Sequence, residues 1–167
     1  MFKVFQIQIS DEVCDFVNSP EGGHTNTANK YPEYHARLET QHRGSERFEG
    51  DMFEHYTSVC NVAVDGGLVA DAEPWQVRDL EDVFAVLNGR YMDEDTGEDI
   101  VFDAHVSGYT TRTFLNKTTK EPRTVRNMHS LSVGDIVFDS VTDTYNMVDG
   151  MGFSDITAQI LSSQPGV

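Results

Sequence analysis

The 167-residue chain has few cysteines, few basic residues and no long apolar run. Its two cysteines, Cys14 and Cys60, fall in a helical and a strand pattern, which predicts small buried side chains and argues against a disulfide framework. No run of about eighteen apolar residues occurs, so the sequence predicts no membrane span. The amino terminus, MFKVFQIQIS, lacks the apolar core and cleavage site of a secretory signal, and a cytoplasmic location is therefore expected.

Local motifs of the common enzyme classes are also missing. There is no Gly-x-Gly-x-x-Gly before a helix, no Walker lysine loop and no Gly-x-Ser-x-Gly. The six histidines form no i, i+3 or i, i+4 pair on a helix, and no Cys-x-x-Cys accompanies them. The sequence DEDTGED resembles the start of a calcium loop, but its glycine and its later acid fall at the wrong positions. No metal and no cofactor are therefore predicted.

Acidic residues are what the chain has in excess. Asp and Glu number 28 against 12 Lys and Arg, a formal net charge of −16. Nucleic acids and anionic membranes bind positive surfaces, so direct binding to either is not expected. The charge indicates a basic partner, and the alternative is that acidity serves only solubility.

Six of the acids fall between Asp93 and Asp103, where the pattern predicts a hairpin. A β-strand rises by about 3.4 Å per residue, close to the phosphate spacing along one strand of duplex DNA, so such a hairpin could imitate a nucleic-acid backbone. The acids expected to contact a partner are Asp93, Glu94, Asp95, Glu98 and Asp99.

The segment 112–126 reverses the sign of the charge and is predicted to be an exposed loop. It carries five basic residues against the single acid Glu121. Lys117, Lys120 and Arg123 are the candidates there for a contact with the acidic hairpin or with an acidic partner.

Hydrophobic periodicity predicts both helices and strands. The best-delimited helix begins after Asp79, presents Leu80, Val83, Phe84 and Leu87 on one face, and ends at Gly89. In chain order the expected elements are a strand at 2–9, a helix from Ser10-Asp11, a loop at 18–30, a helix from Pro32 to Gly44, a strand at 53–64, an irregular stretch around Pro74 and Trp75, the helix at 79–89, a hairpin at 90–111, the loop at 112–126 and two strands within 129–156.

This element order predicts an α+β fold with a mostly antiparallel sheet and helices packed on one face. One compact domain is expected over residues 1–167. Its N-terminal strand–helix–helix portion would span 1–52, and a second portion would span 53–161, with the hairpin and loop inserted at 90–127.

The segment HSLSVGDIVFDSVTDTYNMVDGMGFSDI, residues 129–156, breaks its strand pattern at Gly134-Asp135, which predicts a bulge or tight bend. SLSVGDIV, a short return strand and a Gly-Phe together resemble the YodL-like domain of bacteria, phages and mobile elements. Upstream, DLEDVFAVLN and YTSVCNVAV resemble the helix and the strand that precede this block. The resemblance implies a small accessory protein of a phage or mobile element, acting in the host cytoplasm, and supplies no catalytic residues.

The expected function is to bind and inhibit or modulate a basic host protein that itself binds nucleic acid, as an anti-restriction or other anti-defence factor. One alternative is a small hydrolase or nucleotide-processing enzyme that uses His55, Asp103, His105 and Asp135. Another is a structural or virion-associated protein. The absence of local motifs favours a binding protein over an enzyme, and the oligomeric state stays open.

Overall fold

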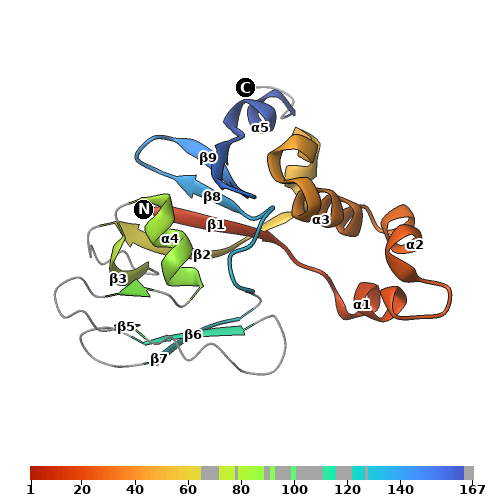
Figure 1. Ribbon diagram of the computed structural model, residues 1–167, viewed down its shortest axis with the longest axis horizontal. Coiled ribbons are helices and arrows are strands. Elements are labelled where there is room, and N and C mark those ends of the chain that lie inside the picture. Colours follow the sequence, from red (N-terminus) through yellow and green to blue (C-terminus); the bar gives the residue numbers. More distant parts are fainter. Residues whose placement is uncertain are drawn as a thin grey trace. The chain divides into compact units, whose positions relative to one another are not determined.

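The computed structural model describes residues 1–64, 72–77, 79–88, 91–92, 99–100, 111–115, 122–126 and 128–163 (Figure 1). The strands are β1 (Phe2–Ile7), β2 (Tyr56–Val64), β3 (Ala72–Val77), β4 (Tyr91–Met92), β5 (Asp99–Ile100), β6 (Thr111–Leu115), β7 (Pro122–Arg126), β8 (Ile136–Asp139), β9 (Thr144–Asp149) and β10 (Gly152–Asp155). The helices are α1 (Asp11–Val17), α2 (Gly23–Lys30), α3 (Pro32–Arg43), α4 (Leu80–Leu87) and α5 (Thr157–Ser163), with 3-10 turns η1 (Gly44–Arg47) and η2 (Gly50–His55).

Among the described strands, the largest sheet has six in the order β10-β9-β8-β1-β2-β3. Strands β9 and β10 pair antiparallel, whereas β2 and β3 pair parallel. Two further antiparallel pairs, β4–β5 and β6–β7, form separate two-stranded sheets. The predicted α+β fold is confirmed.

The chain divides into two compact units built from interleaved segments. The first unit comprises Met1–Val4, Ser58–Leu131 and Val137–Asp143, and the second comprises Phe5–Thr57, Ser132–Ile136 and Thr144–Val167. The single domain with portions at 1–52 and 53–161 stays a prediction.

Helix α4 lies in the first unit, where its capping and periodicity predict a helix. The Asp79 carboxylate accepts a hydrogen bond from the backbone N–H of Asp82 at 3.0 Å, which caps the helix start. Val83 and Leu87 are buried, while Phe84 on the same face is only half-buried. At the other end, the Asn88 side-chain amide donates to the Leu131 carbonyl at 3.0 Å.

Replacing the half-buried Phe84 with alanine is expected to lower the free energy of unfolding by about 1–3 kcal/mol. A fully buried ring would cost about 3–5 kcal/mol, and the part of the Phe84 ring already in contact with water does not contribute to that loss. Urea unfolding checks the value. The exposed Glu81→Ala on the same helix, expected to change stability by less than about 0.5 kcal/mol, is the control. A loss above about 4 kcal/mol for Phe84→Ala would contradict the half-buried placement.

Three successive helices, α1 to α3, occupy much of the second unit. The Ser10 hydroxyl accepts from the Val13 N–H at 3.4 Å at the start of α1, and Pro32 opens α3 at a first-turn position. Gly44 ends α3 with a φ of 56°, a conformation that glycine adopts without strain. Both helices confirm the prediction.

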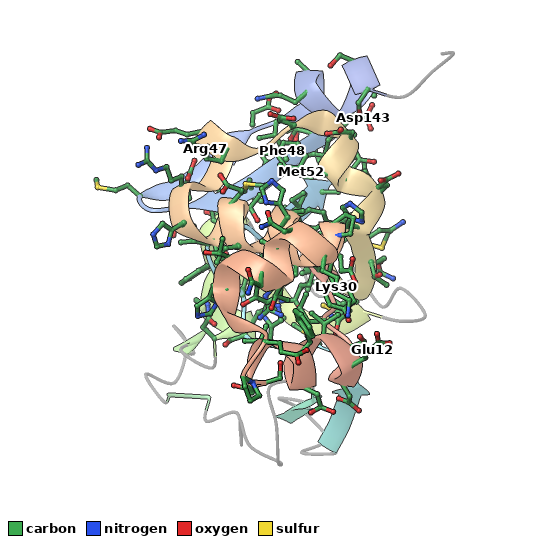
Figure 2. The ribbon with its side chains drawn as sticks, turned by 90° about the vertical axis from the view of Figure 1, so that its right-hand side faces the viewer. Glu12, Lys30, Arg47, Phe48, Met52 and Asp143 are labelled. Atoms are coloured by element: carbon green, nitrogen blue, oxygen red, sulfur yellow. The ribbon has the colours of Figure 1, made fainter. Side chains whose placement is uncertain are left out.

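Helix α2 corrects the prediction of a loop at 18–30. Its sequence, GHTNTANK, has weak intrinsic helix propensity, so contacts outside the helix must support it. Thr27 is buried and donates its hydroxyl to the Gly23 carbonyl at 2.7 Å. The ammonium of Lys30, which Figure 2 labels, lies 4.2 Å from the centre of the Phe16 ring on α1.

The hydrophobic core of the second unit gathers side chains from its turns, strands and last helix. Phe48 from the turn after α3 is buried with four aliphatic or thioether side chains, and Met52 packs against them (Figure 2). The buried partners of Phe48 are Ile136, Met147, Ile156 and Ile160. Helix α5, which the sequence analysis did not predict, contributes Ile160 and packs against β9 and η2.

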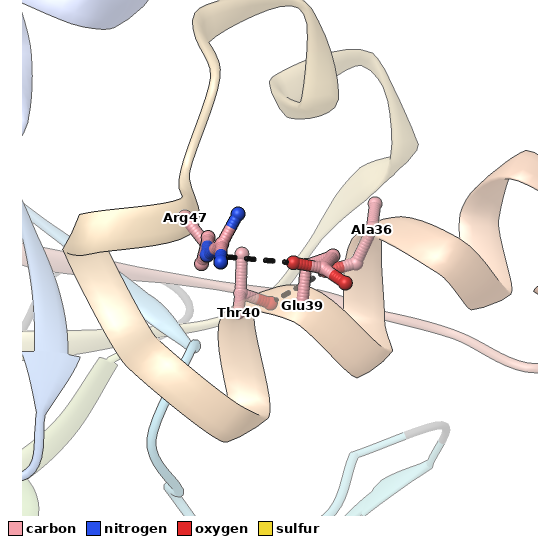
Figure 3. Close-up of polar contacts among 4 residues, drawn as sticks. All are labelled: Ala36, Glu39, Thr40 and Arg47. Carbon is pink, nitrogen blue, oxygen red and sulfur yellow. Dashed lines mark hydrogen bonds and ion pairs between the residues drawn. The ribbon is translucent and has the colours of Figure 1, made fainter.

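The junction between α3 and η1 shows how the chain turns toward this core. In Figure 3 the Thr40 hydroxyl donates to the Ala36 carbonyl at 2.8 Å, and both residues are buried. The neighbouring Arg47 Nε lies 3.9 Å from the Glu39 carboxylate on a solvent-exposed edge. Such an exposed pair contributes little to stability, so buried packing fixes the junction.

Three further predictions are corrected by the observed strands. The predicted strand at 53–64 begins only at Tyr56, because Gly50–His55 forms a 3-10 turn. The stretch around Pro74 and Trp75 is strand β3, which ends the strand order of its sheet, and proline is tolerated on an edge strand. The segment predicted as a loop at 112–126 contains β6 and β7, whose sequences TRTFL and PRTVR are rich in strand-forming residues.

Candidate functional site

A small pocket lies among the three helices of the second unit. Its volume is about 260 Å³. The lining residues are Ile9, Cys14, Val17, Asn18, His24, Tyr34, Arg37, Leu38 and Gln41. Aliphatic side chains therefore provide one part of the wall, and a cation, an imidazole, a phenol, a thiol and amides provide the rest. A concave site of this mixed kind is typical of small-molecule binding.

Two of the polar lining residues contact each other directly. The Nδ1 atom of His24 lies 2.6 Å from the Tyr34 hydroxyl, and the two rings stack with their centroids 6.2 Å apart. Tyr34 is half-buried, whereas His24 is exposed. The contact fixes the phenol and the imidazole beside the pocket, because each ring restricts the other.

Arg37 supplies the positive charge of the pocket. It follows Tyr34 by three residues on α3, a spacing that places both side chains on one face of the helix. Arg37 is half-buried, and its guanidinium makes no ion pair or hydrogen bond within the described part of the chain. A partly desolvated guanidinium without such a partner favours the approach of an anion.

A buried carboxyl group, Asp135, lies in the second unit at the predicted bend. One oxygen of Asp135 accepts hydrogen bonds from the Gln6 side chain and from the Ser132 backbone N–H, both at 2.9 Å. Burial raises the pKa of Asp135 from 3.8 to about 7, although these hydrogen bonds and the charge of Arg37 oppose the rise. Asp135 therefore changes its charge near neutral pH.

The bend itself confirms the bulge predicted at Gly134-Asp135. Gly134 has a φ of 91°, and its N–H donates to the Val148 carbonyl at 2.9 Å. The Tyr56 hydroxyl donates to the Gly134 carbonyl at 2.6 Å, and it lies 3.4 Å from the Thr40 hydroxyl. Burial raises the pKa of Tyr56 far above its ordinary value, so this phenol stays protonated and acts as a donor.

A second carboxylate, Asp149, ties the turn after β9 to η1. It accepts hydrogen bonds from the hydroxyls of Ser45 at 2.5 Å and Ser154 at 2.6 Å. Partial burial acts to raise the pKa of Asp149, but the bonds from Ser154 and Ser45 hold it below its ordinary value. The described side-chain partners of Asp149 are serine hydroxyls that hold the turn in place. We therefore assign Asp149 a structural role.

Most of the side chains predicted to bind a partner lie outside the described residues. These are Asp93, Glu94, Asp95, Glu98, Lys117 and Lys120. Asp99 lies on β5 opposite Met92, which confirms pairing at the base of the predicted hairpin. Arg123 lies on β7 opposite Phe114, in a strand instead of the predicted loop. The binding roles of these eight residues stay predictions.

Two of the four residues of the alternative enzyme hypothesis, His55 and Asp135, lie in the described part of the chain, and each contacts different groups. His55 on η2 has its Nε2 3.6 Å from the Glu54 carboxylate. Asp135 instead contacts Gln6 and Ser132, while Asp103 and His105 lie outside the described residues.

Cys14 corrects a further prediction, because it is exposed at the pocket instead of buried, while Cys60 is half-buried. Within the described residues, no group of three or more His, Cys, Asp or Glu side chains is placed to share a metal ion. That same part of the chain holds no helix long and apolar enough to cross a membrane.

Sequence reasoning missed the pocket, although the Tyr34 and Arg37 spacing on a predicted helix offered a signal. The rest of the pocket wall comes from Ile9, from α1 and the residue after it, and from His24 on α2, which was predicted to be a loop. Comparisons of the chain with protein-family models, with curated proteins and with solved structures give no match. The resemblance to the YodL-like domain stays a prediction.

Proposed function

We propose that this chain is an acidic accessory protein of a phage or mobile element that binds a basic host macromolecule and inhibits or modulates it. One observation carries the proposal: in the second unit, exposed acids outnumber exposed bases threefold. The exposed acids there are Asp11, Glu12, Asp15, Glu21, Glu46, Glu49, Asp51, Glu54 and Asp155, and the exposed bases are Lys30, Arg43 and Arg47.

These acids are largely unneutralised. Among the described residues, Glu54 is the one member of this set with an ion-pair partner, His55. The other ion pair described joins Arg47 to Glu39, which is half-buried and outside the set. Glu12, which Figure 2 labels, accepts a hydrogen bond from the Tyr31 hydroxyl at 3.0 Å, and this neutral donor leaves its negative charge in place. Exposed charges of one sign create a long-range field that speeds the encounter with an oppositely charged partner.

The partner that fits this charge best is a protein whose own basic cleft binds nucleic acid. The acidic hairpin would then occupy that cleft in place of phosphates, with Asp93, Glu94, Asp95, Glu98 and Asp99 as the contacting acids. The spacing of residues along a strand, about 3.4 Å, supports this extension of the proposal. An anti-restriction or other anti-defence role would follow from blocking such a host protein.

Affinity capture from the presumed host, followed by kinetics with the captured partner, tests the proposal. Neutralising the five hairpin acids to Asn and Gln is expected to lower the association rate at least about tenfold while changing dissociation much less, because steering acts before contact. Binding should also weaken steeply between about 50 and 300 mM salt and should compete with DNA or RNA.

A matched variant distinguishes an effect of the hairpin acids from an effect of the total negative charge of the surface. Neutralising five exposed acids of the second unit, Asp11, Glu12, Asp15, Glu46 and Glu49, removes the same charge elsewhere and is expected to slow association only a few-fold. Equal effects of the two variants would assign steering to the whole surface and remove the special role of the hairpin. A partner that binds equally at low and high salt, with nucleic acid still bound, would overturn the proposal.

A further inference from the structure

We propose that the pocket among α1, α2 and α3 is a binding site for a small organic carboxylate with a short aliphatic or aromatic body. The proposal goes beyond the interaction with a basic macromolecule and is independent of it. It rests on three features of the pocket: a cation without an ion pair among the described residues, a hydrogen-bond donor beside it, and an aliphatic wall in a restricted volume.

The cation is the Arg37 guanidinium. It is half-buried and lines the pocket, and it has no ion pair or side-chain hydrogen bond within the residues that the structure describes. Its charge acts on the buried carboxyl of Asp135 without an ion pair between the two groups. Arg47, by contrast, shows the usual surface arrangement of an arginine in its ion pair with Glu39. A guanidinium presents parallel N–H groups that match the two oxygens of a carboxylate, and partial burial strengthens such a bond.

The donor comes from the His24 and Tyr34 pair, whichever tautomer the imidazole adopts. If the Tyr34 hydroxyl donates to Nδ1 across the 2.6 Å contact, the Nε2–H of His24 is left as a donor. If Nδ1–H donates instead, the phenolic O–H remains available. In both cases the pair keeps one N–H or O–H group to give to an anion, and neither ring needs to be charged.

The aliphatic wall and the volume of the pocket determine the apolar body of the ligand. Ile9, Val17 and Leu38 provide aliphatic surface next to these polar groups. The volume of about 260 Å³ lies below the range of about 300–1,000 Å³ typical of drug-sized ligands. Water takes about 30 Å³ per molecule in the liquid, so the pocket suits a body of roughly ten heavy atoms. Benzoate and hexanoate have this size and charge.

A ligand titration of the full chain followed by two-dimensional ¹H–¹⁵N NMR tests the site. Benzoate and hexanoate are expected to shift the amide signals of Ile9, Arg37 and Leu38 in a saturable way. Benzamide, which has the same shape without the charge, should bind at least about ten times more weakly. Acetate, which lacks the apolar body, should also bind at least about ten times more weakly than hexanoate.

Substitutions in α3 identify the contributing groups. Arg37→Gln is expected to weaken benzoate at least about tenfold and leave benzamide unchanged, and Tyr34→Phe should weaken benzoate a few-fold. Arg43→Gln, an exposed arginine in the last turn of the same helix that does not line the pocket, is the control and should bind as the original chain does. Should Arg37→Gln fail to fold, Arg37→Lys and the comparison of benzoate with benzamide in the original chain decide the question.

Two results would overturn the proposal. One is equal affinity for benzoate and benzamide, which would show that the charge of Arg37 takes no part. The other is the lack of saturable, localised shifts with either acid up to about 10 mM, since an isolated charge-assisted contact with apolar burial should bind below that concentration.

Discussion

Replacing Gly134 with alanine is expected to lower the free energy of unfolding by about 2–5 kcal/mol, measured by urea unfolding. Gly134 has a φ of 91°, where a side chain costs about 1–2 kcal/mol. A Cβ atom there would lie 2.9 Å from both the carbonyl carbon and the hydroxyl of Thr40, and 3.1 Å from the Gln41 nitrogen. Two of these atoms belong to the backbone of α3, so relief requires a shift of the helix or the bend, at a further cost of about 1–3 kcal/mol.

The shift would also disturb hydrogen bonds that meet at the bend. The Gly134 carbonyl accepts from the Tyr56 phenol at 2.6 Å, and the Gly134 N–H donates to the Val148 carbonyl at 2.9 Å. A buried carbonyl left without a donor costs about 1–3 kcal/mol. Gly134→Val, which places a branched side chain at the same φ, should therefore lower the free energy of unfolding at least as much as Gly134→Ala.

Alanine substitutions at two other glycines distinguish the stability cost of a positive φ from the cost of a close contact with a neighbouring atom. Gly23 has a φ of 80°, but a methyl group added there would have no described atom within 4 Å, so Gly23→Ala should cost only about 1 kcal/mol. Gly150 combines open space with an ordinary φ, and Gly150→Ala should leave stability within about 0.5 kcal/mol. If Gly134→Ala cost no more than Gly23→Ala, the close approach of Gly134 to α3 would contribute nothing.

The bend at Gly134 shows what a sequence pattern can predict and what it cannot. A break in the period of two predicted a bulge, because a strand cannot keep its alternation through an extra residue. The pattern did not identify the partners, since Thr40 and Tyr56 are distant in sequence from the bend. Local periodicity therefore located the special backbone, and only the folded chain shows why glycine is required there.

The wrong assignments arise where tertiary contacts override local preference. Helix α2 has weak helix formers, and packing of Thr27 together with the Lys30 contact to Phe16 supports it. Strand β3 contains Pro74, which a central strand would exclude but an edge strand accepts. By contrast, α1, α3 and α4 were predicted because caps and apolar spacing are local signals.

The pocket could not be predicted for the same reason. Tyr34 and Arg37 share a face of a predicted helix, but nothing in the sequence indicated that His24 would approach Tyr34 from a second helix. Cys14 was expected to be buried because its neighbours have helical spacing, yet Val13 takes the buried position and Cys14 is exposed at the pocket. A shift of one residue on a short helix moves a side chain by about 100°, enough to exchange a buried position for an exposed one.

Replacing Asp135 with asparagine is expected to remove a pH dependence of stability between about pH 4 and pH 7. The pKa of this carboxyl rises from 3.8 to about 7 on folding, chiefly through burial, so between these values the folded chain holds a proton that the unfolded chain has released. The contribution of Asp135 to stability is then greatest below about pH 4 and is lost as the pH rises to about 7. A shift of about three pKa units corresponds to up to about 4 kcal/mol.

Urea unfolding at intervals from pH 4 to pH 8 measures the effect as the difference between the original chain and Asp135→Asn. Asparagine keeps the shape of the side chain and an acceptor oxygen for the Gln6 and Ser132 donors, without a charge at any pH. The variant should therefore gain stability relative to the original chain as the pH rises, most of it between about pH 5 and pH 7.

Asp155 provides the control, because it is an exposed carboxylate in the same unit. Hydrogen bonds from Thr157 lower the pKa of Asp155 in the folded chain. The contribution of Asp155 to folding stability is therefore present above the pKa of the unfolded chain, and it is lost as the pH falls through the lower pKa of the folded chain. Asp155→Asn should leave the pH dependence between about pH 5 and pH 7 unchanged. If Asp135→Asn and the original chain followed parallel curves across that interval, Asp135 would be ionised in the folded chain, and the charge of Arg37 together with the donors from Gln6 and Ser132 would outweigh its burial.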